Sequence, residues 1–293
     1  MIWPFIARSL EIATILLLAA IGELLDERAG VLNVGIEGLM LFGGAAGFIA
    51  ALKWGLLPGF IVGTIVGGAF GLLHAILSIT LKVNQVVSGM GVWLFAMGFV
   101  TYWADRYSGP LPMGMVSPKI YGLSPMFFIA LAIVFVIWFI LSRTHLGLKI
   151  RSVGEDPSTA EVSGVNVIRI RYLCTTIGGL LGGLAGAFLV LTYLACWSHL
   201  PTMGLGWVAL ALVMFSLWRP PILLAGALLF GFIWQFAISP ETIYAGIPAP
   251  LPVLRMLPFA VTIIFLTAIS SERFRRKWAL AKPAALGQPY IKE

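Results

Sequence analysis

Charged side chains are scarce in this sequence. Asp, Glu, Lys and Arg make up 11% of its 293 residues, whereas hydrophobic residues make up 60%. The mean hydropathy is +0.99, and a soluble fold of this length cannot hide so much apolar surface. The shortage of charge therefore excludes a soluble domain and indicates that the solvent of this protein is lipid.

Cysteine and histidine are also rare, with two cysteines and three histidines in the whole chain. Cys174 and Cys196 fall in or at the end of one apolar run, which offers neither a disulfide framework nor a metal site. His74, His145 and His199 are scattered and suggest local hydrogen bonds. We expect packing roles for the cysteines, no metal and no cofactor.

Catalytic motifs are missing as well. No segment has the form G-x-x-x-x-G-K-[ST], so the chain cannot hydrolyse ATP by phosphate-loop chemistry. The sequence also lacks a nucleophile elbow, a zincin pattern and a pair of carboxylates close in sequence with a plausible soluble pocket around them. We therefore expect that the chain is not an enzyme.

Long apolar runs are what the sequence has in abundance, and several approach the roughly 20 residues that cross a bilayer as a helix. Alternating strand patterns are absent, so the sequence predicts an all-α, polytopic membrane bundle. We expect the chain to form one transmembrane domain at 1–272, followed by a cytoplasmic tail at 273–293. We expect about eight spans and a possible broken or re-entrant segment near 30–53; the spans lie near 9–25, 56–81, 86–104, 123–141, 172–195, 204–218, 221–238 and 252–270.

The formal net charge of +7 indicates orientation and not nucleic-acid binding, because Lys and Arg collect in cytoplasmic loops. Residues 142–171 and the tail from 271 carry these basic residues, so both are expected in the cytoplasm. Counting spans back from them leaves two alternatives. The N-terminus lies outside if 34–53 crosses as a regular helix, and inside if that segment re-enters or breaks.

The stretch "ERAGVLNVGIEGLMLFGGAAG", residues 27–47, places polar residues and glycines among apolar ones. Asn33 and Glu37 lie four residues apart, and a carboxylate in the membrane must be paired, hydrated or protonated. Gly30, Gly35 and Gly38 supply backbone freedom for a break. We expect Asn33 and Glu37 to line a path; the alternative is that they brace a bent helix by hydrogen bonds.

Five segments resemble one family of transporters. "GELLDERAGVLNVGIEGLMLFGGAAG" is similar to the membrane subunits of sugar-type and branched-chain-amino-acid-type ABC importers. Four further segments, in order along nearly the whole chain, resemble the nucleoside branch: "VNQVVSGMGVWLFAMG", "RTHLGLKIRSVGEDPSTAEVSGVNVIRIRYL", "MGLGWVALALVMFSLWRPPILLAGALLFG" and "KPAALGQPY".

The resemblance implies a permease subunit in a bacterial or archaeal plasma (inner) membrane. Its partners would be separate ATPase subunits, a second homologous permease and an external solute-binding protein, with lipid around it. The solute would be small and polar, most specifically a nucleoside. The residues that we expect along the substrate pathway are Asn33, Glu37, Asn84, Gln85, Trp93 and Trp207.

A short helix is expected inside the loop at 142–171. Asp156 is placed to cap it, Pro157 to begin it and Gly164 to end it. The resemblance implies that this is a coupling helix that docks on the ATPase, with Gly154 and Ala160 as small residues that allow close approach. The alternative is a solvated loop with an incidental helical turn.

Two other function classes remain open on the sequence. A stand-alone secondary transporter would use Glu37 or Glu11 to bind a coupling proton or ion. It would have no reason to keep a docking helix between basic flanks. An intramembrane enzyme would need a catalytic constellation, and the sequence offers none.

Overall fold

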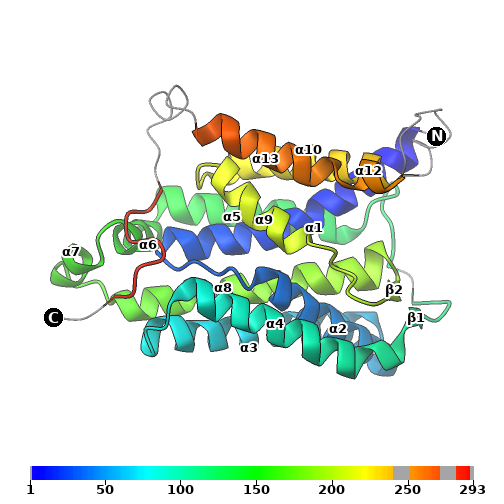
Figure 1. Cartoon of the computed structure of the whole chain (residues 1–293), viewed down its shortest axis with the longest axis horizontal. Helices are drawn as coiled ribbons and strands as arrows, with labels where there is room; N and C mark the ends of the chain where they lie inside the picture. The colour runs from blue at the N-terminus through cyan, green and yellow to red at the C-terminus, as the bar shows by residue number, and fades with distance from the viewer. Residues whose placement is uncertain (1, 116, 240–250, 271–281, 291–293) are drawn as a thin grey trace.

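The computed structural model describes residues 2–115, 117–239, 251–270 and 282–290. Its helices lie side by side along the long axis of the molecule (Figure 1). Seven of the described helices are long and apolar enough to cross a membrane: α1 (Ile2–Arg28), α2 (Ile36–Trp54), α3 (Leu56–Ala75), α4 (Gln85–Ala104), α5 (Pro125–Arg143), α8 (Val167–Phe188) and α10 (Pro220–Ile238). The all-α membrane bundle predicted from the sequence is confirmed.

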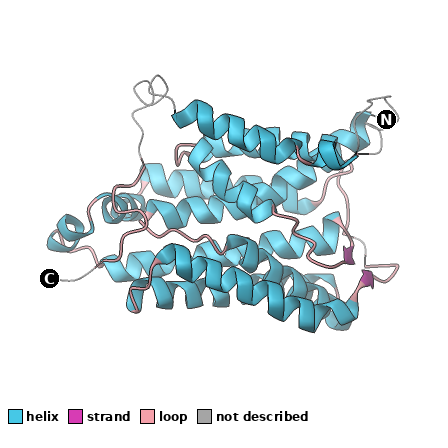
Figure 2. Ribbon diagram, viewed as in Figure 1, coloured by secondary structure: helices cyan, strands magenta, loops and turns pink. Residues whose placement is uncertain are grey.

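Shorter elements complete the described chain. Five-residue π-helical turns, Ile76–Thr80 and Leu189–Tyr193, extend α3 and α8. Two strands, β1 (Gly109–Pro110) and β2 (Cys196–Trp197), pair antiparallel, with Gly109 opposite Trp197 (Figure 2). The remaining helices are α6 (His145–Glu155), α7 (Pro157–Val162), α9 (Leu205–Phe215), α12 (Leu251–Arg255) and α13 (Leu257–Ser270).

Two expected spans are shorter than predicted. The one near 252–270 is divided into α12 and α13, the longer of which has 14 residues. α9 has 11 residues, which is about 16 Å of helix, or roughly half of a bilayer core. Residues 194–204, which precede it, form strand and turns instead of helix. The segment near 204–218 therefore enters the bundle as a half-length helix whose N-terminus lies among the other helices.

Three helices form the interior of the bundle. α8 packs against α1, α2 and α3, and α1 also packs against α10. α1, α2 and α8 are mostly buried, whereas α3, α4, α5 and α10 expose much of their apolar surface. A Cβ on Gly43 of α2 would collide with the backbone of Gly183 on α8, so small residues let these helices approach closely.

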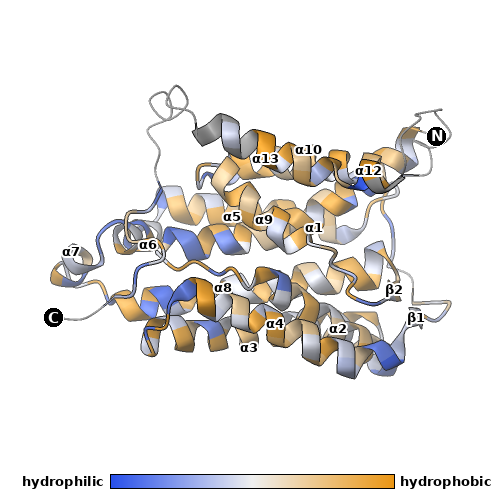
Figure 3. Ribbon diagram, viewed as in Figure 1, coloured by the Kyte–Doolittle hydropathy of each residue, from blue (hydrophilic) through white to orange (hydrophobic). Residues whose placement is uncertain are grey.

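The two ends of the bundle differ. We call the end that carries α6 and α7 the α7 end, and the opposite end, which carries β1 and β2, the β1 end (Figure 1). Hydrophilic residues gather around α6 and α7 and near β1, and the middle is largely hydrophobic (Figure 3). This distribution is typical of a bundle whose middle lies in lipid.

The N-terminus lies at the β1 end. Trp3 Nε1 donates a hydrogen bond to Tyr121 O (3.0 Å), and Glu11 forms an ion pair with Lys119 (3.2 Å). Both partners belong to the connection between α4 and α5, opposite the basic loop at 142–171 (Figure 1). The alternative in which the N-terminus shares a side with that loop is therefore wrong, although the chain does break between α1 and α2.

The loop at 142–171 is more helical than expected. The helix expected after Asp156 is present as α7, but the sequence analysis missed α6. α6 begins after Thr144, whose hydroxyl accepts a hydrogen bond from Gly147 N (3.2 Å). Several polar residues and two glycines obscure this helix in the sequence.

The end of the chain returns to the bundle. Ala285 N donates to Gly154 O (2.9 Å), and Gly287 N donates to Gly30 O (3.3 Å), so residues 282–290 pack at the α7 end. Of the tail expected at 273–293, residues 273–281 and 291–293 lie outside the described residues, and the first of these ranges contains the basic cluster Arg273, Arg275, Arg276 and Lys277.

Candidate functional site

The break between α1 and α2 is held by side chains instead of helical hydrogen bonds. Gly30 adopts φ +84°, a conformation that favours glycine. Leu32 N donates to Gln85 Oε1 (2.7 Å), and Asn33 N donates to Glu23 Oε1 (2.9 Å). Non-helical backbone inside a membrane bundle needs such partners. Gln85 and Glu23 therefore keep the break ordered.

Three carboxylates lie on the last two turns of α1. Glu23, Asp26 and Glu27 are fully buried, and their i, i+3, i+4 spacing places them on one face of the helix. Glu27 accepts a hydrogen bond from Trp218 Nε1. The second oxygen of Glu23 and of Glu27, and both oxygens of Asp26, have no hydrogen-bond partner among the described residues. The side chain of Asn33 lies beside the Asp26 carboxylate, but the two groups do not form a hydrogen bond of normal geometry.

Arg171 joins this break to the end of the chain. The sequence analysis counts it only among the basic residues of the loop at 142–171, and in the structure it is 1% exposed. Its Nε donates to Ala29 O (3.2 Å) and its Nη1 donates to Gln288 O (3.1 Å). Sequence reasoning also missed the role of Glu23, Asp26 and Glu27, although charged residues at the end of an apolar run are the signal that could have found them.

Glu37 holds the N-terminus of α9 against α2. Its Oε1 accepts from the Thr202 hydroxyl (2.5 Å) and Gly204 N (2.9 Å), and its Oε2 accepts from Gly206 N (2.6 Å). The carboxylate thus meets unpaired amides and the positive end of a helix dipole. Glu37 is 4% exposed, so in this conformation its carboxylate braces two helices.

Two tryptophans that lie 114 positions apart in the chain meet next to this brace. The rings of Trp93 on α4 and Trp207 on α9 are in edge-to-face contact, with centroids 5.4 Å apart and planes at 83°. A Cβ on Gly38 would lie 2.8 Å from Trp93 Cα, so α4 packs directly on α2 beside Glu37. Both tryptophans are half-buried. Their remaining surface can stack on a solute.

The other expected pathway residues lie elsewhere. Gln85 is buried at the break, where its Oε1 accepts a hydrogen bond from Leu32 N. Asn33 is the next residue of the same short segment. Asn84 is exposed and caps α4 by accepting hydrogen bonds from Val86 N (3.0 Å) and Val87 N (3.2 Å). The structure therefore groups Glu37 with the two tryptophans, and Asn33 with Gln85, and leaves Asn84 apart.

α7 begins with a strong cap. The Asp156 carboxylate accepts hydrogen bonds from the hydroxyls of Ser158 (2.6 Å) and Thr159 (2.5 Å) and from Thr159 N (3.1 Å). These bonds, led by that from Ser158, lower the pKa of Asp156 to about 2. Because the folded pKa is depressed, the cap contributes stability above the usual carboxyl pKa, and that stability is lost as the pH falls toward 2. Gly164 ends the helix with φ +84°.

The expected coupling residues divide between two faces. Gly154 and Ala160 are buried against the bundle, whereas Asp156 is exposed and Pro157 is half-buried. A Cβ on Gly154 would collide with the carbonyl of Arg28. The outermost apolar side chain is Val162, which is 92% exposed and which the sequence analysis did not select.

Comparison with known proteins identifies the family. The model of the branched-chain amino acid transport system permease component matches residues 5–266. The chain belongs to this permease family. The protein is thus a multi-pass membrane permease of the ABC importer type. The five sequence segments indicated the same family.

Individual relatives match over nearly their full length. A putative glucose ABC transporter permease protein of Haloferax volcanii is 38% identical over 97% of this chain and 96% of the relative. A guanosine ABC transporter permease protein of Bacillus subtilis is 32% identical over 97% of this chain and 95% of the relative. A nucleoside ABC transporter permease protein of Lactococcus lactis is 29% identical, with 98% and 96% covered.

Proposed function

We propose that this permease carries nucleosides and that the paired tryptophans Trp93 and Trp207 lie on the path. The observation that supports this proposal is their edge-to-face contact, 5.4 Å between centroids, at the junction of α4 and α9. Each ring keeps exposed surface, and an aromatic face stacks on any nucleobase. Guanosine and nucleoside permeases among the relatives point in the same direction.

A sugar is the second candidate solute. The relative from Haloferax volcanii is a putative glucose permease at 38% identity, and aromatic rings also pack against the apolar face of a sugar. The two candidates differ in what the tryptophans contribute. Stacking on a base is worth about 1–3 kcal/mol, so nucleoside transport depends on these rings in a way that can be measured.

The path itself needs a second permease. α4 exposes Met90, Leu94 and Phe95 on the outside of the bundle, and Gly91 borders open space there. We propose that a homologous permease covers this side and completes a pathway of which Asn33, Glu37, Asn84 and Gln85 form the remaining lining. A solute-binding protein would dock at the β1 end.

Coupling to ATP hydrolysis is assigned to α7. We propose that the α7 end faces the cytoplasm of a bacterial or archaeal cell and that separate ATPase subunits receive α7 in a groove. Val162 is the apolar anchor of this contact, because its side chain is 92% exposed at the tip of the bundle. Gly154 and Ala160 contribute on the opposite face, where their small size lets α6 and α7 pack closely against the bundle.

A secondary transporter is disfavoured by the same geometry. Glu37 would have to exchange a proton or ion, but three donors already occupy its oxygens. Glu11 is paired with Lys119 at the β1 end. An exposed docking helix with Val162 at its surface fits a permease that is driven by partner subunits.

The test is uptake into proteoliposomes that hold the complete complex, with its binding protein outside and ATP inside. We expect uptake of a purine or pyrimidine nucleoside and none of glucose. Trp207→Ala should lower the uptake rate about tenfold, and Trp207→Phe should keep most of it. The matched control is Trp54→Ala, since Trp54 is 66% exposed at the β1 end. Uptake of glucose alone would contradict the nucleoside proposal.

The docking face of α7 is tested in the same vesicles. Val162→Asp should leave the permease inserted but abolish solute-stimulated ATP hydrolysis, because a charge replaces the apolar anchor. Ser163→Asp places the same charge at the next exposed position and should have a small effect. Equal stimulation of ATP hydrolysis by solute in both variants would show that Val162 is not part of the docking contact.

A further inference from the structure

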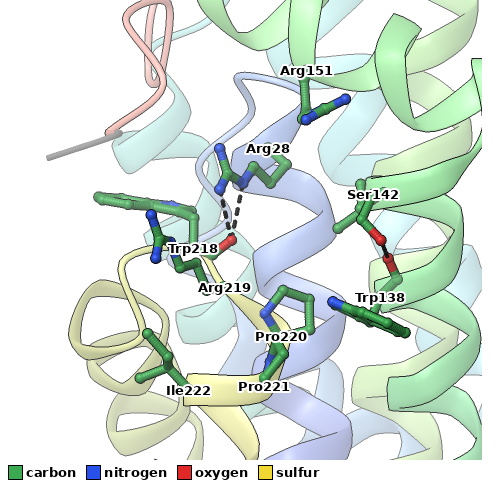
Figure 4. A pocket seen from close by; sticks show the side chains of 10 residues that line it. Arg28, Trp138, Ser142, Arg151, Trp218, Arg219, Pro220, Pro221 and Ile222 are labelled. Carbon is green, nitrogen blue, oxygen red and sulfur yellow. Dashed lines mark hydrogen bonds between the residues drawn. The ribbon is translucent and has the colours of Figure 1, made fainter. Parts of the chain in front are cut away.

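A cavity of about 410 Å³ opens at the α7 end between α1, α5, α6 and the start of α10 (Figure 4). Three arginines from three different parts of the chain line it: Arg28, Arg151 and Arg219. No step of the transport cycle proposed above uses them.

The positive charge in this cavity is poorly neutralised. Arg28 donates through Nε and Nη2 to Trp218 O (3.0 and 2.8 Å), which fixes its guanidinium group (Figure 4). Arg151 and Arg219 are exposed, and both lie near enough to repel Arg28 electrostatically. Glu155 is the acidic neighbour of Arg28. Within the described ranges, none of the three arginines forms an ion pair within 4.0 Å.

An apolar groove continues from the arginines along the outside of the bundle. It has a volume of about 380 Å³, and Leu131, Val134 and Phe135 of α5 line it together with Leu224 of α10. Trp138 and Pro221 line both spaces, so the groove adjoins the arginine cavity.

The direction of the groove matches that of a lipid tail. Leu131 precedes Trp138 by seven residues on α5, which is about 10 Å along the helix axis. That distance runs away from the α7 end and into the hydrophobic middle. Trp138, which is half-buried, lies where the groove meets the arginine cavity, a position that suits tryptophan at a membrane surface.

We propose that this composite site binds an anionic phospholipid, with its phosphate among Arg28, Arg151 and Arg219 and one acyl chain in the groove between α5 and α10. Guanidinium groups bind phosphate oxygens through paired hydrogen bonds. The positive end of the α10 dipole, at Pro220, adds to the attraction. A soluble phosphate would use the arginines alone, whereas a lipid also fills the apolar groove.

The test titrates the purified full-length chain in detergent, by native mass spectrometry, with phosphatidylglycerol, phosphatidylcholine or inorganic phosphate. We expect phosphatidylglycerol to bind most tightly. The double variant Arg151→Gln/Arg219→Gln should bind it roughly 25-fold more weakly, since each basic residue near an anionic lipid contributes about fivefold. Arg143→Gln is the control, because Arg143 is exposed at the same end but outside the cavity.

A second variant separates lipid from free anion. Leu224→Trp fills the groove without changing a charge. It should therefore weaken the binding of phosphatidylglycerol and leave the binding of inorganic phosphate unchanged. Melting temperatures equal to wild type establish that the variants are folded; the single variant Arg219→Gln replaces the double one if it fails to fold. Equal binding of both lipids, full competition by phosphate, or phosphatidylglycerol binding unchanged in the arginine variants would overturn the proposal. If the same variants lost the ATPase subunits when purified as the complete complex, and still bound phosphatidylglycerol as wild type does, the arginines would belong to a protein interface and the proposal would be wrong.

Discussion

Glu37 and the three carboxylates of α1 are buried to the same degree but are bonded very differently. Glu37 is 4% exposed, and Glu23, Asp26 and Glu27 are not exposed at all. Yet both oxygens of Glu37 accept hydrogen bonds, from three donors around the N-terminus of α9. In α1, Asp26 accepts no hydrogen bond from the described residues, and Glu27 accepts one, from Trp218 Nε1.

This difference shows that burial alone does not define what a membrane carboxylate does. A fully bonded carboxylate such as Glu37 fixes the position of the helices that donate to it. A buried carboxylate with free oxygens costs free energy instead. Asp26 therefore adds little to the stability of the fold.

The largest effect is expected from Glu37→Leu. The substitution leaves the Thr202 hydroxyl and the amides of Gly204 and Gly206 without an acceptor, at about 1–3 kcal/mol for each buried group. We expect the variant to fail to assemble, as measured by the folded fraction in size-exclusion chromatography after solubilisation. A wild-type yield of folded protein would show that Glu37 does not brace α2 and α9.

Glu37→Gln separates the brace from the proposed path. Glutamine keeps one acceptor oxygen but turns an amide group toward a donor, so we expect a folded protein of lower melting temperature. If Glu37 also lines the path, uptake per folded complex should fall while ATP hydrolysis is largely retained. Normal uptake per folded complex would leave Glu37 with the bracing role only.

A smaller loss is expected from Trp218→Phe. This change removes the donor to Glu27 Oε2, so that neither oxygen of this buried carboxylate has a partner among the described residues, and the newly lost bond costs about 1–3 kcal/mol. We expect a lower melting temperature than wild type but a higher one than for Glu37→Leu. Trp54→Phe, at an exposed position, serves as the control. A loss as large as that of Glu37→Leu would contradict the difference between the two regions.

The sequence predicts the outer parts of this molecule well. Apolar runs of about 20 residues mark most of the spans, because lipid requires that length of helix. The α7 cap is readable too, since Asp156, Pro157 and Gly164 are local signals whose effect does not depend on tertiary packing.

The interior could not be predicted in the same way. The brace joins Glu37 to Gly206, 169 positions later in the chain, and Arg171 binds Gln288 O, 117 positions later. No local pattern records such partners. The N-terminus was ambiguous for a related reason: parity counting treats 30–53 as either a span or a re-entry, whereas the chain breaks at 29–35 and then continues as α2.

The smallest effect on stability is expected from Asp26→Asn. Since neither oxygen of Asp26 accepts a hydrogen bond within the described parts of the chain, the substitution loses none, and it removes an ionisable group from a buried site. The Thr175 hydroxyl, also buried without a partner there, belongs to the same region of α8 as Gly178, against which Asp26 packs. We expect the free energy of unfolding to stay within about 1 kcal/mol of that of wild type, so the melting temperature in detergent should stay close to the wild-type value or rise. A destabilisation as large as that of Trp218→Phe would mean that the Asp26 charge is bonded in the folded protein, and that the α1 carboxylates brace the bundle as Glu37 does.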